Sequence, residues 1–275
     1  MKTGYQQGDR LAYWWIDHYV DVSDAQEPPT REAIARFFAW HRQSQLPEIS
    51  TLLTQARDQV RQPVSASSIV QFQESSQRLA RQSFDRAMSD VADLLLTLTP
   101  AQIDRIEKKF DEGNTKYRKK FLSGNAQDRE SARFDKVMDY AKLIYGSFSD
   151  EQEKAIHAAM GPLMQGAQAR YAERLRRQED WLALARQVQQ THPPKEQVIE
   201  LLRRYADHWQ HPPGETRAAS HDANNQAGVA LVATIANLTT PAQKAHAVER
   251  FQKWIDDTRS LIRERQGNTA QAANQ

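Results

Sequence analysis

A short phrase that marks the start of an α-helix occurs four times along this chain of 275 residues. In each copy a hydrophobic residue leads into a Ser or Thr, and a Gln follows that hydroxyl residue three positions later; the fourth copy has one extra residue, Thr239, between Leu238 and the capping Thr240. The hydroxyl can accept a hydrogen bond from the amide of the third helical residue, and the Gln side chain can reach back to the amide of the capping residue. The four capping pairs are Ser23 with Gln26, Thr99 with Gln102, Ser149 with Gln152, and Thr240 with Gln243.

The composition favours helices as the only regular structure. The chain has only 10 Gly, well below the usual share of roughly 7%. No Asn-Gly or Asp-Gly turn lies between alternating apolar runs, and no Val/Ile/Thr-rich segment keeps a period of two. Hydrophobic residues make up 39% of the chain, which long helices with wide polar faces would explain. The sequence therefore predicts an all-α protein, an extended assembly of about eight or nine long amphipathic helices.

The predicted helices follow from apolar spacing and from helix-breaking residues. Hydrophobic residues spaced by three and four from Phe84 to Leu98 predict a helix over residues 67–97. A helix over residues 150–190 would be kinked at Gly161-Pro162. The other helices are expected over residues 30–63 with a bend at Leu46-Pro47, and over 100–122, 126–145, 195–210, 215–237 and 241–265. We expect an N-terminal lobe of residues 1–146, a C-terminal lobe of residues 147–266, and a disordered polar tail of residues 267–275.

One predicted helix is apolar around its whole circumference. Leu11 to Ile16 contains adjacent Trp14 and Trp15, whose side chains would point about 100° apart, so one core face cannot receive both. We expect this helix to be packed between two others, or to be held against a partner or a membrane. If both indoles are buried, each Trp→Ala change should lower the free energy of unfolding by roughly 3–5 kcal/mol.

A second aromatic segment is Trp40-His41-Arg42, which precedes Leu46-Pro47. Core packing explains such a segment most simply, but Trp and Arg are also the residues favoured in binding hot spots. Together the two aromatic segments supply the candidate binding residues, which are Trp14, Trp15, Asp17, Tyr19, Trp40, His41 and Arg42.

Signals for catalysis are weak. Asp17, His18 and Asp21 lie at neighbouring helical positions and could form an acid–base cluster, although a polar helix edge is the simpler interpretation. No phosphate-binding loop, dinucleotide fingerprint or nucleophile elbow is present, and the absence of Cys removes disulfides, thiolate ligands and Cys nucleophiles. We therefore predict no catalytic residue, no metal site and no cofactor.

The charges also bear on the partners. Lys and Arg number 37 against 35 Asp and Glu, for a net charge of +2, which argues against nucleic acid as the main partner. The densest basic stretches, residues 116–120 and 170–177, are interpreted as solvated helix faces.

The capping phrase resembles the LTxxQ motif of the periplasmic helical chaperones of the Spy and CpxP type, which are ATP-independent and cradle unfolded clients. Over most of its length the chain resembles a domain-of-unknown-function family of Gram-negative bacterial lipoproteins. The residues that carry this second resemblance are Gly4-Tyr5, Tyr13 to Asp17, Tyr19 to Asp21, Ala39 to Arg42, Leu46-Pro47, Leu98 to Gln102 and Tyr117 to Leu122.

The resemblance to lipoproteins implies a location but no activity. In that family a signal peptide and a lipid-bearing Cys come just before the Gly-Tyr segment, whereas this sequence starts at Met1 and has no Cys. We therefore expect the native protein to sit in the periplasm, tethered to a membrane by a lipid anchor that this sequence lacks.

Three functional hypotheses follow from the sequence. The first is a non-enzymatic periplasmic protein that binds envelope or unfolded proteins, as a chaperone-like protein or an envelope-assembly adaptor. The alternative is a carrier of lipid or another small apolar ligand, in an internal pocket lined by the N-terminal helix and Trp40. The third is an enzyme that uses Asp17, His18 or His41.

Overall fold

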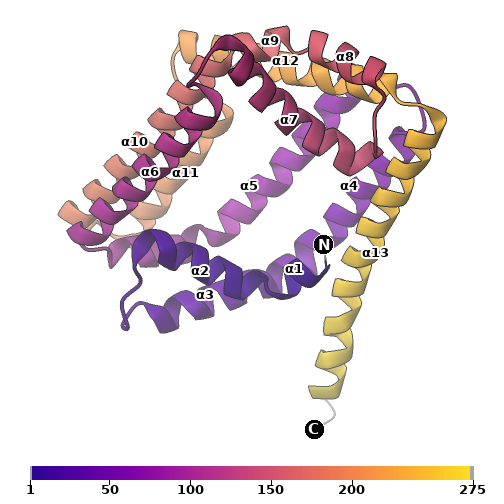
Figure 1. Cartoon of the computed structure of the whole chain (residues 1–275). Helices are drawn as coiled ribbons and strands as arrows, with labels where there is room; N and C mark the ends of the chain where they lie inside the picture. Colours follow the sequence, from indigo (N-terminus) through magenta and orange to yellow (C-terminus); the bar gives the residue numbers. More distant parts are fainter. Residues whose placement is uncertain (1, 273–275) are drawn as a thin grey trace.

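The computed structural model describes the backbone of residues 2–272 and the side chains of Lys2 and residues 4–263, and in this range it is helical without any strand. The predicted all-α class is thereby confirmed (Figure 1). The helices in chain order are α1 (Lys2–Gln6), α2 (Gly8–Val20), α3 (Glu27–Trp40), the π-helical segment η1 (His41–Gln45), α4 (Leu46–Gln59), α5 (Ala66–Leu96), α6 (Pro100–Phe121), α7 (Ala126–Tyr145), α8 (Asp150–Ala158), α9 (Gly161–Gln165), α10 (Ala167–Thr191), α11 (Lys195–Gln210), α12 (Glu215–Leu238) and α13 (Pro241–Ala272).

The predicted number of eight or nine helices is wrong, because two segments expected as single helices are divided. Residues 30–63 become α3, η1 and α4, with Pro47 in the first turn of α4, where its missing N–H costs little. Residues 150–190 become α8, α9 and α10. Pro162 opens α9, and Gly166 stands between α9 and α10.

Gly166 lies where α12 comes close to the start of α10. A Cβ atom at this position would lie 1.9 Å from Oδ1 of Asn224 in α12. Only a residue without a side chain lets α12 approach so closely here.

The last helix is longer than expected. α13 continues to Ala272, beyond the predicted end near residue 265, and residues 273–275 of the predicted tail lie outside the described residues. None of the helices in the described range combines the length and the apolar character that crossing a bilayer requires.

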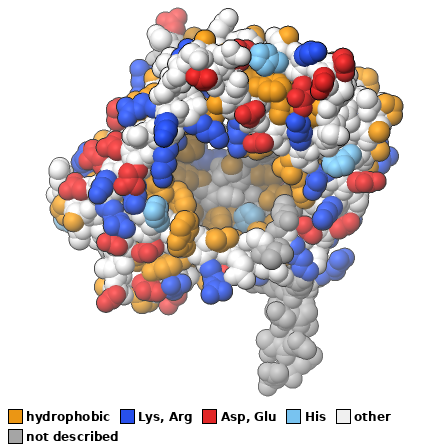
Figure 2. All heavy atoms as spheres, viewed as in Figure 1, with side chains coloured by type: hydrophobic (Ala, Val, Ile, Leu, Met, Phe, Trp, Pro, Cys, Tyr) orange, Lys and Arg blue, Asp and Glu red, His pale blue; other side chains and the backbone are white. Residues whose placement is uncertain are grey.

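The helices are arranged around a central hollow. Figure 1 shows α2 and α3 below it, α6, α10 and α11 on one side, α7, α8, α9 and α12 above, and α4 with α13 on the other side, while α5 runs behind. Figure 2 shows that this face is hollowed at its centre, with hydrophobic side chains along part of the rim and Lys and Arg side chains along its upper margin.

Two separate hydrophobic clusters hold these helices together. The first joins α2, α5, α6, α10 and α11 around Leu95, Ile103 and Leu202. The second joins α4, α7, α8, α12 and α13 around Ile156 and Phe251. Both clusters take residues from before and after residue 146, so burial alone does not separate the predicted lobes of residues 1–146 and 147–266.

The capping phrases form the expected hydrogen bonds at three helix starts. Thr99, Ser149 and Thr240 each accept a bond from the amide of the Gln three residues later, and each donates its own amide to that Gln side chain. At Ser23 only the second bond is present, because a turn separates this residue from the start of α3 at Glu27.

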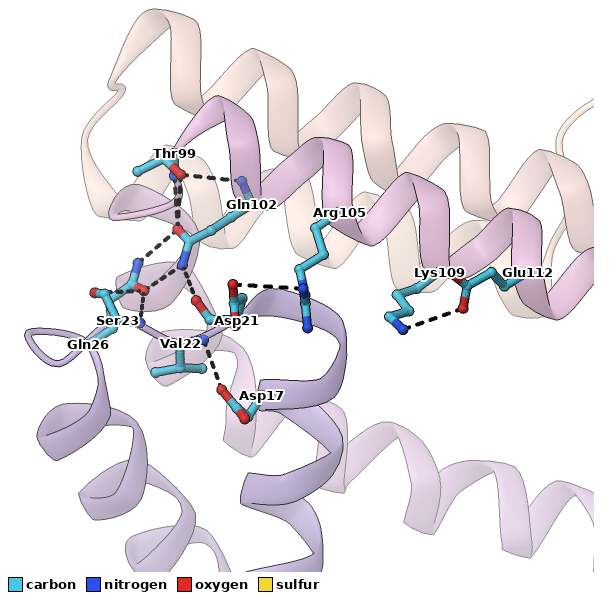
Figure 3. Close-up of polar contacts among 10 residues, drawn as sticks. All are labelled: Asp17, Asp21, Val22, Ser23, Gln26, Thr99, Gln102, Arg105, Lys109 and Glu112. Carbon is cyan, nitrogen blue, oxygen red and sulfur yellow. Dashed lines mark hydrogen bonds and ion pairs between the residues drawn. The ribbon is translucent and has the colours of Figure 1, made fainter.

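The glutamines of these phrases also pair with one another. The Nε2 of Gln26 lies 3.2 Å from Oε1 of Gln102, and the Nε2 of Gln102 lies 2.7 Å from Oε1 of Gln26 (Figure 3). Each Nε2 also donates to a backbone carbonyl of the other connection, at Thr97 and Asp21 respectively. This pair joins the α2–α3 connection to the α5–α6 connection.

The same arrangement is built a second time. Nε2 of Gln152 donates to Oε1 of Gln243 at 2.8 Å, and Nε2 of Gln243 donates back at 3.1 Å. Their second acceptors are the carbonyls of Leu238 and Ser147. In both pairs each carbonyl acceptor lies two residues before the hydroxyl residue of the partner's capping phrase. The two junctions therefore use equivalent positions of the phrase.

Gln102→Glu tests whether this pairing holds the helices together. One oxygen of the new carboxylate would replace Nε2 opposite the carbonyl of Asp21 and Oε1 of Gln26. We expect the free energy of unfolding to fall by about 3 kcal/mol at neutral pH. The pKa of the new carboxyl should be raised in the folded state, so the loss should shrink as the pH falls through that value.

Urea melts at several pH values measure this effect, with Gln71→Glu at an exposed position of α5 as the control. Gln243→Glu should behave like Gln102→Glu because it belongs to the second pair. Equal stability of the Gln102→Glu and Gln71→Glu variants would show that the pairing contributes nothing.

Candidate binding site

An exposed strip of large side chains runs along α2. Leu11, Trp14 and Trp15 are 54%, 62% and 58% exposed. The Trp14 ring stacks on His18, with centroids 5.6 Å apart, and Trp15 packs on Tyr19 at 4.8 Å. We call Leu11, Trp14, Trp15 and His18 the aromatic strip.

As one of the two expectations had it, α2 packs against two other helices, α3 and α6. Tyr13 lies under the Arg31 guanidinium of α3 at 3.6 Å, and Tyr19 lies against Phe110 of α6 at 6.0 Å. The helix is nevertheless not enclosed, because Trp14 and Trp15 stay exposed. The exposed indoles fit the other expectation, a helix held against a partner or a membrane.

Beside the strip lies a cleft of about 850 Å³ between α2, α3, α5 and the start of α6. We call it the apolar cleft, because small and apolar side chains make up most of its walls. Alanines on all three helices leave the space that larger side chains would fill. The walls include Ala12 and Ile16 from α2, Ala33 and Phe37 from α3, and Ala87 and Val91 from α5.

Polar groups occur at a few places in the cleft. The Gln26–Gln102 pair and Thr99 contribute to its wall. The guanidinium of Arg36 on α3 forms an ion pair with Asp90 on α5 at 2.7 Å, which spans the two helices. Apolar walls with few polar anchors are the usual features of a site for an apolar ligand or side chain.

The predicted binding residues of the second segment lie in a different cluster. Trp40 packs on Phe37 with centroids 5.8 Å apart, and Nδ1 of His41 lies 3.0 Å from the hydroxyl of Tyr5. The Arg42 guanidinium lies over the Tyr5 ring at 5.5 Å. Burial and the charge of Arg42 lower the pKa of His41, which favours the neutral imidazole. None of the ring contacts in the described range joins this cluster to Trp14 or Trp15, and Trp40 does not line the apolar cleft.

The acidic residues near α2 have separate roles. Oδ1 of Asp17 accepts a hydrogen bond from the Val22 amide at 3.0 Å, which closes the end of the helix (Figure 3). Asp21 has a φ of 60° and lies 3.7 Å from Arg105. His18 stacks on Trp14, so the three groups do not meet at one point. Among the described residues no group of three or more His, Asp or Glu is placed to hold a metal ion.

Sequence reasoning missed the apolar cleft. Its alanines are spread over three helices, and no local pattern relates them. The signal available was the position of Ala12, Ala33 and Ala87 next to larger apolar residues, and it becomes meaningful only when the helices are placed together.

The exposure of the indoles changes the expected effect of their removal. Trp14→Ala and Trp15→Ala should each lower the free energy of unfolding by less than about 1 kcal/mol, because more than half of each side chain already contacts solvent. Leu95→Ala, at a side chain that is 2% exposed, should cost about 2–5 kcal/mol. Urea melts of the three variants make the comparison, and a loss of 3 kcal/mol or more for either Trp variant would contradict the exposed position.

Comparison with known proteins identifies a family whose function is unknown. No curated protein and no solved structure matches the chain. Residues 18–212 match the model of a family of unknown function, DUF6279. This range includes the end of α2, the α3 and α5 walls of the apolar cleft, and the Gln26–Gln102 pair. The match confirms the predicted membership of a family of unknown function and extends over more than half of the chain, so the protein belongs to the DUF6279 family.

Proposed function

We propose that this protein binds other proteins without catalysing a reaction, by holding apolar segments of a partner on the aromatic strip and in the apolar cleft. The exposure of Trp14 and Trp15 on one helix carries this proposal. Exposed clusters of large apolar side chains mark interaction surfaces, and Trp is enriched among the residues that dominate binding energy.

The position of the strip supports a chaperone-like or adaptor role. A partner segment that contacts the indoles can continue into the apolar cleft, because Ala12 and Ile16 of the same helix form one wall of it. The hollow in Figure 2, with hydrophobic side chains on its rim, offers a concave surface to a larger client. The periplasmic location and a lipid anchor are part of the proposal and are supported by the resemblance to bacterial lipoproteins.

Aggregation of a chemically unfolded client tests the chaperone-like form of the proposal. At stoichiometric amounts the protein should suppress light scattering, and the double variant Trp14→Ala, Trp15→Ala should lose most of this effect. The control is Tyr140→Ala, because Tyr140 is 57% exposed on α7, outside the strip. Unchanged scattering with the unsubstituted protein would exclude the chaperone-like form.

The adaptor form requires specific partners instead. Crosslinking in envelope fractions followed by mass spectrometry should recover a short set of proteins with the unsubstituted chain and with Tyr140→Ala. Recovery of the same set with the double Trp variant would show that the aromatic strip is not the binding surface.

The volume of the apolar cleft favours a second candidate function, the transport of a lipid or another small apolar ligand. About 850 Å³ lies within the range of roughly 300–1,000 Å³ that is usual for ligand sites. The expected polar anchors are present in the Arg36–Asp90 ion pair. Trp40, which was expected to line such a pocket, lies outside it.

Native mass spectrometry of protein purified from cells should then show a bound lipid. Ala87→Phe fills the cleft from α5 and should abolish this binding, whereas Ala80→Phe, at an exposed position of the same helix, should retain it. A ligand-free mass for the unsubstituted protein would argue against the carrier function, and equal retention by both variants would place the ligand elsewhere.

A further inference from the structure

A second cleft, of about 400 Å³, lies between α10 and α12 and is lined by arginines. We call it the arginine cleft. Glu173 is the one acidic residue among those that line it, and the arginines are Arg170, Arg174, Arg176, Arg177 and Arg217. The sequence interpretation of residues 170–177 as a solvated helix face does not hold for Arg170 and Arg174, which are half-buried.

Glu173 neutralises only part of this charge. Its carboxylate accepts two hydrogen bonds from Arg217, at 3.0 and 3.1 Å, and a third from Arg177 at 3.0 Å. The two bonds from Arg217 join α10 to α12, and the three bonds together engage both oxygens of the carboxylate. Among the described side chains, the ion pairs of Glu173 are with Arg177 and Arg217 and do not include Arg170, Arg174 or Arg176.

Arg170 and Arg174 have neutral partners instead of a counter-ion. Nη1 of Arg170 donates to Oδ1 of Asn224 at 2.8 Å, and its Nη2 is buried without any hydrogen-bond partner. Nε of Arg174 donates to Oδ1 of Asn114 at 2.8 Å. Among the described side chains no ion pair involves either arginine.

A third cation adds to the excess of positive charge. Nη2 of Arg133 on α7 donates to the hydroxyl of Tyr117 at 3.3 Å, and Arg174 lies over the same ring at 5.6 Å. Burial and the charge of Arg133 together lower the pKa of Arg170 from its usual value. Burying a guanidinium without an anion is costly in free energy. This group of cations therefore favours the binding of an anion.

The backbone maintains this arrangement. A Cβ atom at Gly166 would lie 1.9 Å from Oδ1 of Asn224 and 2.7 Å from Nη1 of Arg170. The missing side chain therefore leaves room for the Arg170–Asn224 contact, which fixes the direction of the guanidinium.

We infer that the arginine cleft binds a phosphate group, with Arg170 and Arg174 as its charged donors. A guanidinium presents paired N–H donors that match phosphate oxygens. Thr216, Ser220 and His221 add further polar groups to the wall, and a phosphate has enough oxygens to accept from several donors at once. The cleft is larger than a bare phosphate ion, so the ligand class is a phosphate ester, either soluble or the headgroup of a lipid. This inference does not depend on the proposed function.

Calorimetric titration of the full chain with inorganic phosphate and with glycerol 3-phosphate tests the site. The unsubstituted protein should bind both saturably, and Arg170→Gln should weaken binding at least about tenfold, because a charge-assisted bond is lost. Arg203→Gln removes the same charge from an exposed ion pair with Glu200 on α11 and should bind as the unsubstituted protein does. No saturable binding, or equal binding by the Arg170→Gln and Arg203→Gln variants, would overturn the inference.

Asn224→Asp provides a test that does not remove an arginine. The new carboxylate can accept the same bond from Nη1 of Arg170 and supplies the anion from within the chain. Its second oxygen replaces Nδ2, which donates to the Ser220 carbonyl at 2.8 Å, so the melting temperature alone does not test the inference. We expect this variant to lose phosphate binding. Unchanged phosphate affinity in the Asn224→Asp variant would show that Arg170 does not form the site.

Vesicle flotation distinguishes the two sources of phosphate. If the ligand is a lipid headgroup, vesicles of phosphatidylcholine with phosphatidic acid should carry the protein, pure phosphatidylcholine should not, and Arg170→Gln should abolish the difference. If the ligand is a soluble ester, the titrations should show binding while neither vesicle carries the protein. The inference fails if neither assay shows a dependence on Arg170.

Discussion

The reciprocal bonding of glutamine amides at two junctions is the constraint on which the arrangement of the helices depends. An amide is both donor and acceptor, so each glutamine can accept the amide of its own helix cap while it donates to its partner. The paired residues are separated by 76 positions in one junction and 91 in the other. Each junction thus connects two turns of the chain that no local interaction would bring together.

These polar junctions matter because the hydrophobic interior is divided. Two clusters of buried residues, one on each side of the hollow, replace a single continuous core. The Gln26–Gln102 pair also forms part of the wall of the apolar cleft, so the same bonds that join the helices shape a candidate binding surface. Cooperative networks of this kind specify one arrangement when all their members are satisfied.

Local features of the fold could be predicted from the sequence, and features that depend on tertiary contacts could not. Helix-breaking residues give the bounds of α7 and α11 as observed, because Gly124 and Gly146 flank α7 and Pro-Pro pairs flank α11 in the sequence itself. Nothing local indicates which glutamine meets which, or that α2 lies at an edge and leaves Trp14 exposed. The density of arginines in α10 is visible in the sequence, but the burial of Arg170 depends on the approach of α12 at Gly166, and that of Arg174 on its contacts with α6.

The two glutamine junctions contain no ionisable group among their paired side chains. Ion pairs between exposed side chains, such as Arg203 with Glu200, weaken as salt screens them and vanish when the carboxylate is protonated. An amide side chain keeps the same hydrogen-bond donors and acceptors over the whole pH range in which proteins remain folded. The helix connections that these two glutamine pairs join should therefore stay together when the pH and the ionic strength of the medium change widely. The ion pairs on the surface should weaken or strengthen with the same changes.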